Sequence, residues 1–392
     1  MTGTINGSLA AAFDAFRRGL VTEFLAWQRT IVDDYRRESQ FVTQNFDYEW
    51  RGHSFGVQGT VDHFKAADAV TLAGVDIYHP GEDRLTGHEI GFGGDISRSL
   101  KDGAPYLVVE TQAQGQMGWL PYPGQLRLQA YSHLASGAMG VMYWHWGSLH
   151  NSFETYWKGL LSQDYSPNPT YLEAAGFGRE IAEHAEALTG LTKRNRIAMM
   201  VSNDSLTALE WFGLESGFPR RYSGGGANYN DVFRWVYDAL FDLNLEADVV
   251  PADAAACEGG SDVEVLAVYD HHAWSGPAIA TRAVGRGSLT HLAAMTSPAL
   301  TRALLRLVAR RAGATDWAAD LAGTVTVRKG VNGAGRPLTY LLNYSRDAVR
   351  VTLPVGGRDV LGTARPAGGA LAAGADVVVP AWGVLIVEGE RD

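Results

Sequence analysis

The sequence of 392 residues contains one cysteine, Cys257. A single cysteine excludes an internal disulfide and any zinc site built from several cysteines. No run of about 18 apolar residues could span a bilayer, and the ends lack the charged-then-apolar segment of a secretory signal. We therefore expect a cytoplasmic protein without a membrane partner. The formal net charge of −10 argues against nucleic acid as a partner, because phosphate binding needs a basic surface.

Signatures of several common sites are missing as well. The glycines at 224–226 are not followed by the Lys-Ser/Thr pair of a phosphate-binding loop. His145 and His150 have no third ligand at a recognisable spacing, so we expect neither a metal ion nor another cofactor. Tryptophan, in contrast, is abundant. Seven of the eleven tryptophans lie at or before Trp211, which predicts that binding chemistry sits in the first half of the chain.

The clearest helical pattern covers residues 9–35, where apolar residues recur at three- and four-residue steps and form one stripe. The stripe consists of Leu9, Phe13, Phe16, Leu20, Phe24, Trp27, Ile31 and Tyr35. Ser8 stands where an N-cap is expected. Because the stripe is wide and aromatic, we expect this helix to pack against something large.

Short apolar runs then alternate with helical segments as far as about residue 188. The runs lie at 41–43, 69–75, 106–109 and 139–142, and each leads into polar or aromatic residues. Strand and helix in alternation predict a parallel sheet with right-handed crossovers. Four strands are half of a closed barrel, so the expected fold class is α/β, a partial (β/α)8 TIM barrel of about four βα units.

The pattern changes after Lys193. Strands at 197–201, 263–268 and 289–293 and helices at 229–243 and 298–312 predict a flavodoxin-like α/β layer, shortened at the Ala- and Gly-rich stretch 251–261. From about residue 323, short β runs joined by Gly- and Pro-rich turns predict a small antiparallel β-sandwich. We place the domain boundaries at 1–192, 193–314 and 315–392.

Glu110 carries the strongest indication of chemistry. It ends the apolar run 105–109 and precedes a small polar stretch, as catalytic groups do at the carboxyl ends of barrel strands. Trp119, Tyr122 and Trp157 follow it. A carboxylate among aromatic rings indicates a sugar site, since ring faces stack on the CH surfaces of sugars. On the pattern alone, an ordinary polar residue that caps a buried strand explains Glu110 equally well.

Several ordered segments carry a resemblance to a known family. They are residues 44–47, 74–80, 107–112, 118–127, 144–146 and 150–159, with weaker segments at 208–211, 229–232 and 341–344. Together they resemble glycoside hydrolase family 42, the β-galactosidases with a (β/α)8 barrel, a trimerisation domain and a small β domain. The resemblance implies a homotrimer in carbohydrate metabolism that hydrolyses terminal β-D-galactosides with retention of configuration.

The resemblance also implies roles for individual residues. Glu110 matches the nucleophile, Trp119 the tryptophan beside the galactose, and Glu154 the carboxylate that binds its hydroxyls. Many family members have a histidine three residues after that glutamate. Here the residue is Trp157, so we expect stacking in place of a hydroxyl contact. Three further residues are expected to line the site: Asn45, Asp76 and Tyr78.

Two departures from the family pattern stand out. The acid/base glutamate of the family lies in an Asn-Glu motif, and no Asn-Glu pair occurs in this sequence. The first four barrel strands and part of the second domain have no counterpart either, so the chain resembles the C-terminal half of the family. Asp47 and Glu49 are the only obvious local substitutes for the acid. Retaining glycosidases need two carboxyl groups about 5–5.5 Å apart, so competence of this chain alone is in question.

Alternative interpretations remain beside these. Glu154 also fits a helix-start carboxylate, with Asn151 or Ser152 as the cap. Trp144 and Trp146 fit core packing as well as a site. Half a barrel would expose one strand edge and its inner face, which predicts self-association or a partner chain that supplies the missing half. The chain could therefore be a hydrolase completed by a partner, a galactoside-binding remnant, or a structural, oligomerising fragment.

Overall fold

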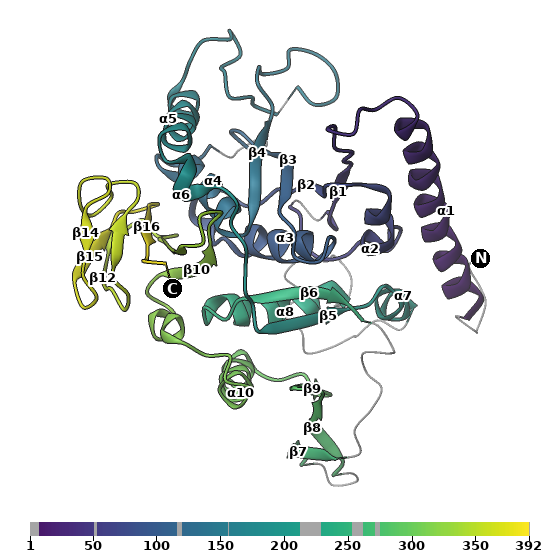
Figure 1. Cartoon of the computed structure of the whole chain (residues 1–392). Coiled ribbons are helices and arrows are strands. Elements are labelled where there is room, and N and C mark those ends of the chain that lie inside the picture. Colours follow the sequence, from purple (N-terminus) through teal and green to yellow (C-terminus); the bar gives the residue numbers. More distant parts are fainter. Residues whose placement is uncertain are drawn as a thin grey trace.

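The computed structural model describes residues 8–50, 53–115, 120–155, 157–211, 229–252, 262–270 and 275–391. Its first part contains a four-stranded parallel sheet in the order β1-β2-β3-β4 (Figure 1). The strands are β1 (Asn45–Asp47), β2 (Gly74–Asp76), β3 (Tyr106–Gln112) and β4 (Ala138–Trp144). The prediction of four parallel strands in chain order is confirmed, although β1 begins after the run 41–43 and β2 contains only the end of the run 69–75.

Helices connect and cover these strands. They are α2 (His63–Ala66), η1 (Ala67–Ala69), η2 (Glu82–Arg84), α3 (His88–Ser99), α4 (Gln125–Ala135), α5 (Pro169–Glu183) and α6 (Ala185–Leu188). Helix α3 is buried along almost its whole length, between the sheet and the next layer. Glycine makes this packing possible: a Cβ atom on Gly93 would stand 2.6 Å from Ile77, and one on Gly91 would stand 2.6 Å from Phe241.

Helix α1 (Ser8–Asp33) lies at one side of the molecule and contacts α2, η1 and α7 (Figure 1). The expectation that its aromatic stripe packs on something large is wrong for this structure. Phe16, Phe24 and Trp27 are each more than half exposed. The helix is anchored instead by Arg18, which is buried and donates to the hydroxyl of Thr207 at 3.0 Å. Within the described ranges, none of the helices combines the length and apolar character of a membrane span.

The second part of the chain differs from the predicted single α/β layer. Its elements are β5 (Ile197–Val201), α7 (Asn203–Trp211), α8 (Tyr229–Asp242), β6 (Ala247–Pro251), β7 (Val263–Val268), β8 (Pro277–Val284), β9 (Gly287–Leu292) and α10 (Pro298–Arg311). In the described residues β5 and β6 pair in parallel, whereas β7, β8 and β9 form a separate antiparallel sheet. A flavodoxin-like layer would need these strands in one parallel sheet, so that prediction is corrected.

The C-terminal part forms two antiparallel sheets, as predicted. One has the order β10-β11-β16-β13-β14 and the other pairs β12 with β15. The elements are η3 (Trp317–Leu321), β10 (Thr326–Val331), β11 (Pro337–Leu342), β12 (Val349–Thr352), β13 (Gly357–Asp359), β14 (Ala370–Leu371), β15 (Asp376–Val379) and β16 (Val384–Glu388). Val351, Val377 and Leu385 belong to one buried apolar cluster, which joins the two sheets.

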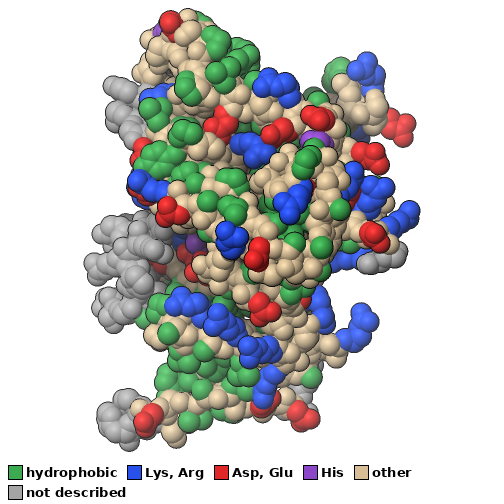
Figure 2. All heavy atoms as spheres, turned by 90° about the vertical axis from the view of Figure 1, so that its left-hand side faces the viewer, with side chains coloured by type: hydrophobic (Ala, Val, Ile, Leu, Met, Phe, Trp, Pro, Cys, Tyr) green, Lys and Arg blue, Asp and Glu red, His purple; other side chains and the backbone are tan. Residues whose placement is uncertain are grey.

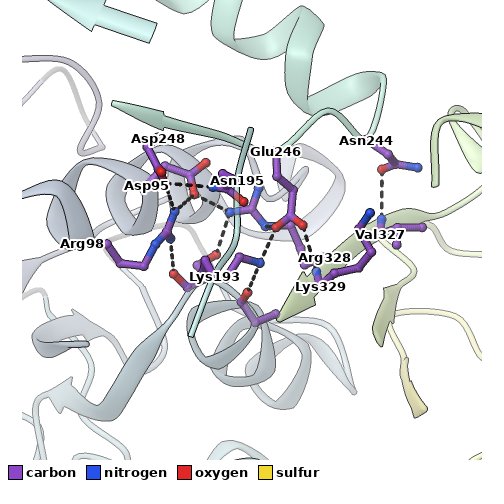
Figure 3. Close-up of polar contacts among 12 residues, drawn as sticks. Asp95, Arg98, Lys193, Asn195, Asn244, Glu246, Asp248, Val327, Arg328 and Lys329 are labelled. Atoms are coloured by element: carbon purple, nitrogen blue, oxygen red, sulfur yellow. Dashed lines mark hydrogen bonds and ion pairs between the residues drawn. The ribbon is translucent and has the colours of Figure 1, made fainter. Parts of the chain in front are cut away.

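A buried network of charges links the three parts (Figure 3). Arg98 of α3 donates to Asp95 and to Asp248 of β6, both at 2.8 Å. Arg328 of β10 donates to the same oxygen of Asp95 at 2.7 Å and contacts Glu246 at 3.1 Å. Although burial opposes the shift, Arg328 and Arg98 lower the pKa of Asp95. Because each part contributes an ion, the network fixes the sheet, β6 and the C-terminal strands to one another.

Two buried histidines predict a loss of stability in mild acid. His79 and His133 lie with ring centroids 6.1 Å apart, and burial lowers the pKa of His79 to about 4. A histidine with a depressed folded pKa contributes stability above its unfolded pKa of about 6.5 and loses it as the pH falls towards the folded value. We expect the free energy of unfolding of the wild type to fall as the pH falls through this window. In His79→Phe the same drop in pH should lower it by about 2–3 kcal/mol less.

Urea unfolding at several values between pH 4 and pH 7 measures this difference. His291→Phe serves as the control, because His291 is exposed on β9 and should leave the pH dependence unchanged. Parallel pH curves for wild type and His79→Phe would contradict the prediction.

Candidate active site

The carboxyl ends of the first three strands bring three carboxylates into one row. Asp47 on β1 is the register partner of Asp76 on β2, and Asp76 is in turn the partner of Glu110 on β3. Register partners on neighbouring parallel strands point to the same face, and such strands lie about 4.8 Å apart. Residues about thirty positions apart in the chain are therefore neighbours in space.

Glu110 is half-buried and accepts a hydrogen bond on each carboxylate oxygen. The side-chain amide of Asn45 donates to Oε1 at 3.0 Å, and the hydroxyl of Tyr78 donates to Oε2 at 2.9 Å. Burial, together with the charge of Glu110, raises the pKa of Tyr78, so the phenol keeps the proton that it donates. The two donors, one on each oxygen, fix the orientation of the carboxylate.

The two aspartates of the row are held in a more protonated state than usual. Burial, then the charges of Glu110 and Asp47, raises the pKa of Asp76 to about 7. Burial is also the main reason why the pKa of Asp47 rises to about 6, against a hydrogen bond that Asp47 accepts from Ser54 at 3.2 Å. An acidic group that titrates near neutral pH beside a carboxylate is typical of catalytic sites.

Aromatic rings and a second glutamate stand next to the row. Trp157 packs edge-to-face on Tyr78 with ring centroids 5.2 Å apart, and Trp50 packs on the same tyrosine at 5.5 Å. Glu154 accepts a hydrogen bond from the indole of Trp144 at 3.1 Å. No helix forms over the described residues from 151 to 157, so the alternative that Glu154 is a helix-start carboxylate is wrong.

The structure thus brings together Asn45, Asp76, Tyr78 and Glu110 by hydrogen bonds and places Trp157 against Tyr78. Trp119 lies outside the described residues. Glu49 does not join the row: its carboxylate accepts a hydrogen bond from Asn230 of α8 at 2.6 Å. Of the two residues considered as substitutes for the acid, Asp47 is the one in the row.

The histidines considered as ligands do not converge. His145 pairs with the carbonyl of Gly147 at 2.7 Å, and His150 pairs with the carbonyl of Gln163. Among the described residues, no three His, Cys, Asp or Glu side chains are arranged to hold a metal ion.

Two residues of this region escape sequence reasoning. Trp50 and Ser54 lie in the segment after β1, which carries no pattern of its own. The signal for them is their position within a few residues of a strand end. That signal is weak, because loop residues at strand ends are usually solvated.

Comparisons with known proteins point to one family. The family model of glycoside hydrolase 42, described as β-galactosidase, matches residues 1–184. A β-galactosidase of Halorubrum lacusprofundi is 29% identical over 258 residues, and one of Haloferax lucentense is 26% identical over 260 residues. The chain resembles part of glycoside hydrolase family 42.

The alignments cover only a part of each relative in family 42. The aligned region covers 59% of this chain but only 35% of the Halorubrum protein, and 63% of this chain but 36% of the Haloferax protein. The chain therefore spans little more than a third of the length of these relatives.

Solved structures of β-galactosidases share the fold. A β-galactosidase from Halorubrum lacusprofundi superposes with a TM-score of 0.75 at 20% identity, over 99% of this chain and 69% of that chain. One from Bacillus circulans superposes with a TM-score of 0.74 at 17% identity, over 97% and 68%. About three tenths of each neighbour is thus without a counterpart here.

Proposed function

We propose that this chain is a glycoside hydrolase of the β-galactosidase type that acts on terminal β-D-galactosides with Glu110 as its nucleophile. The observation that carries the proposal is the carboxylate of Glu110 at the carboxyl end of β3, held by Asn45 and Tyr78 through one hydrogen bond to each oxygen. Names of the relatives, all β-galactosidases, support galactose as the sugar.

The proposed reaction is a double displacement. A carboxylate oxygen of Glu110 forms a bond to the anomeric carbon while the bond from that carbon to the leaving oxygen breaks. The negative charge passes to the leaving oxygen, which takes up a proton unless it belongs to a stable anion. Water then attacks the anomeric carbon, loses a proton and releases Glu110. Trp157 would stack on the sugar, and Glu154 would accept its hydroxyls beside the hydrogen bond from Trp144.

The proton donor is the missing part of this mechanism, because the sequence has no Asn-Glu pair. We propose that a complementing polypeptide supplies it and docks beside β1. The exposed stripe of α1 supports this, as does the position of β1 at the edge of the described sheet. A parallel edge strand normally pairs or is covered.

Self-association through the second part is a further element of the proposal. Val263, Val265 and Val268 of β7 and Leu300 and Leu307 of α10 are all exposed. Hydrophobic side chains gather in the lower part of the face in Figure 2, below a row of Lys and Arg. Apolar patches of this kind usually mark interfaces, which fits a homo-oligomer such as the expected trimer.

Covalent trapping tests the role of Glu110. The chain is incubated with 2,4-dinitrophenyl 2-deoxy-2-fluoro-β-galactoside, whose leaving group needs no proton, and the label is located by peptide mass mapping. We expect one label, on the peptide that contains Glu110. Galactose binding without a label would favour the galactoside-binding remnant. Neither binding nor label would leave only a structural, oligomerising fragment.

The exposed stripe of α1 predicts measurable association. We expect wild type to bind a hydrophobic dye and to exceed the monomer mass in light scattering, because Phe24 and its neighbours face solvent. Phe24→Glu should lower both signals. Ala26→Glu adds the same charge on another side of the helix, where the residue is also exposed, and should change neither. A wild-type monomer that binds no dye would refute the proposed docking surface.

A further inference from the structure

Three neighbouring carboxyl groups cannot all be ionised without a large cost. Asp47, Asp76 and Glu110 occupy successive strands in register, at a spacing of about 4.8 Å between strands. Like charges at this distance disfavour ionisation, so one group in such a row normally keeps a proton. The question is which of the three holds it.

The contacts of the row single out Asp76. Glu110 has two donors, Asn45 and Tyr78, and Asp47 has the hydroxyl of Ser54. Asp76 is the middle member, is only 9% exposed, and its Oδ1 is buried without a hydrogen-bond partner in the described part of the chain. A buried carboxylate oxygen without a partner is costly when charged and much less so when it carries a proton.

The side-chain amide of Asn45 also distinguishes Glu110 from Asp76. Its nitrogen is 3.0 Å from Glu110 Oε1 but 3.4 Å from Asp76 Oδ2, so it bonds mainly to the glutamate. Two ionised carboxylates would compete for this donor, whereas a neutral carboxylic acid accepts more weakly. A proton on Asp76 therefore directs Asn45 towards Glu110.

We propose that Asp76 carries a proton at neutral pH and is a positioning residue, which keeps the amide of Asn45 on the nucleophile. This rests on the proposed role of Glu110. When Asp76 loses its proton at higher pH, Asn45 is shared between two anions and Glu110 is held less firmly. The reaction rate would then fall at alkaline pH because of a residue that does not contact the substrate.

The surroundings of Asp76 support this titration. Burial and the charges on both sides favour its neutral form, and its pKa rises to about 7. The titratable groups around it are Asp47 and Tyr48 from β1 and the residue after it, Tyr78 after β2, Glu110 on β3, and Glu154, which acts on Tyr78. The charges of Glu110 and Asp47 favour a proton on Asp76, whereas the two tyrosines stay neutral.

Carbon-13 NMR of the chain with labelled aspartate carboxyl groups tests the proton directly. In metal-free buffer we expect two aspartate signals to titrate above the ordinary range, that of Asp76 near pH 7 and that of Asp47 near pH 6. The signal near pH 7 should vanish in Asp76→Asn, persist in Asp47→Asn at a lower midpoint, and persist unchanged in Asp68→Asn, which replaces an exposed aspartate of η1. If every aspartate signal that titrates above about pH 5.5 survives in Asp76→Asn, or if none titrates there, the proposal is wrong.

A bound cation is the other way to neutralise the row, and the same spectra decide between the two. Addition of calcium or magnesium should leave the titration near neutral pH in place. If the signal is already ionised at pH 6 and only a chelator restores its protonated form, a cation rather than a proton balances the row, and the proposal is overturned.

The positioning role needs a second readout, the pH dependence of Glu110 labelling by the dinitrophenyl 2-fluoro-galactoside. We expect the wild-type rate to fall about tenfold above pH 7, the effect of about one lost hydrogen bond. In Asp76→Asn, which mimics the neutral acid, the rate should stay level. Equal pH profiles would refute the positioning role. Absence of any label at all pH values would refute the proposed function instead, and the NMR titration would still decide where the proton lies.

Discussion

Arg328→Met is expected to lower the free energy of unfolding by about 3–5 kcal/mol, the typical cost of removing one partner from a buried ion pair. Arg328 is 3% exposed and donates to Asp95, which is 0% exposed. The variant leaves Glu246 and Asp95 with one cation fewer, although their side chains are only 8% and 1% exposed (Figure 3). Because these ions come from three parts of the chain, we expect the variant to destabilise all three parts.

The urea midpoint and the thermal midpoint measure this loss. Arg346→Met is the matched control. Arg346 pairs with Asp83 at the surface, where the side chains are 61% and 55% exposed, and solvent screening leaves such pairs with little effect on stability. Arg328→Lys keeps the charge but loses the planar fork, so it should fall between the two. Similar losses for Arg328→Met and Arg346→Met would show that the buried network does not hold the parts together.

Glu110→Gln is expected to abolish covalent labelling and to slow hydrolysis of 2,4-dinitrophenyl β-galactoside on the order of 10⁴-fold or more. The carboxamide keeps the size of the side chain and still has one oxygen to accept from Tyr78 or Asn45. It lacks the negative charge that attacks the anomeric carbon. The fold should therefore be intact while the first step fails.

Two further variants sharpen this test. Glu49→Gln should label normally, because Glu49 faces Asn230 rather than the row. In Glu110→Gly, added azide can occupy the space of the missing carboxylate. Its nitrogen would bond to the anomeric carbon as dinitrophenolate leaves, giving a galactosyl azide of inverted configuration. A Glu110→Gln variant with wild-type rate, or a label on another residue, would assign the nucleophile elsewhere.

Much of the fold could be predicted from local patterns. The alternation of apolar runs and helical segments predicts four parallel strands, and all four form in chain order. Gly- and Pro-rich turns between β runs predict the two antiparallel sheets of the C-terminal part. These predictions succeed because periodicity follows directly from which face of an element is buried.

The second part of the chain was harder to predict from the sequence, and strands β6 and β8 show why. Residues 247–251 carry only a short apolar run, and β6 becomes a strand by pairing with β5 and packing against α3. Residues 277–284 mix apolar and polar positions without a regular alternation, and β8 forms between two antiparallel neighbours. Here distant contacts, rather than local preference, decide the structure.

The candidate site divides in the same way. Sequence alone determined that Glu110 follows an apolar β run, that aromatic residues follow it, and that no Asn-Glu pair occurs in the chain, since these are properties of neighbouring residues. The strand itself continues past Glu110 to Gln112. Only the tertiary structure decided that Asp47, Asp76 and Glu110 share one row, that Asn45 and Tyr78 hold the glutamate, and that α1 leaves its aromatic stripe in solvent. The reason is that register and burial depend on chain segments far apart in sequence, which no local pattern encodes.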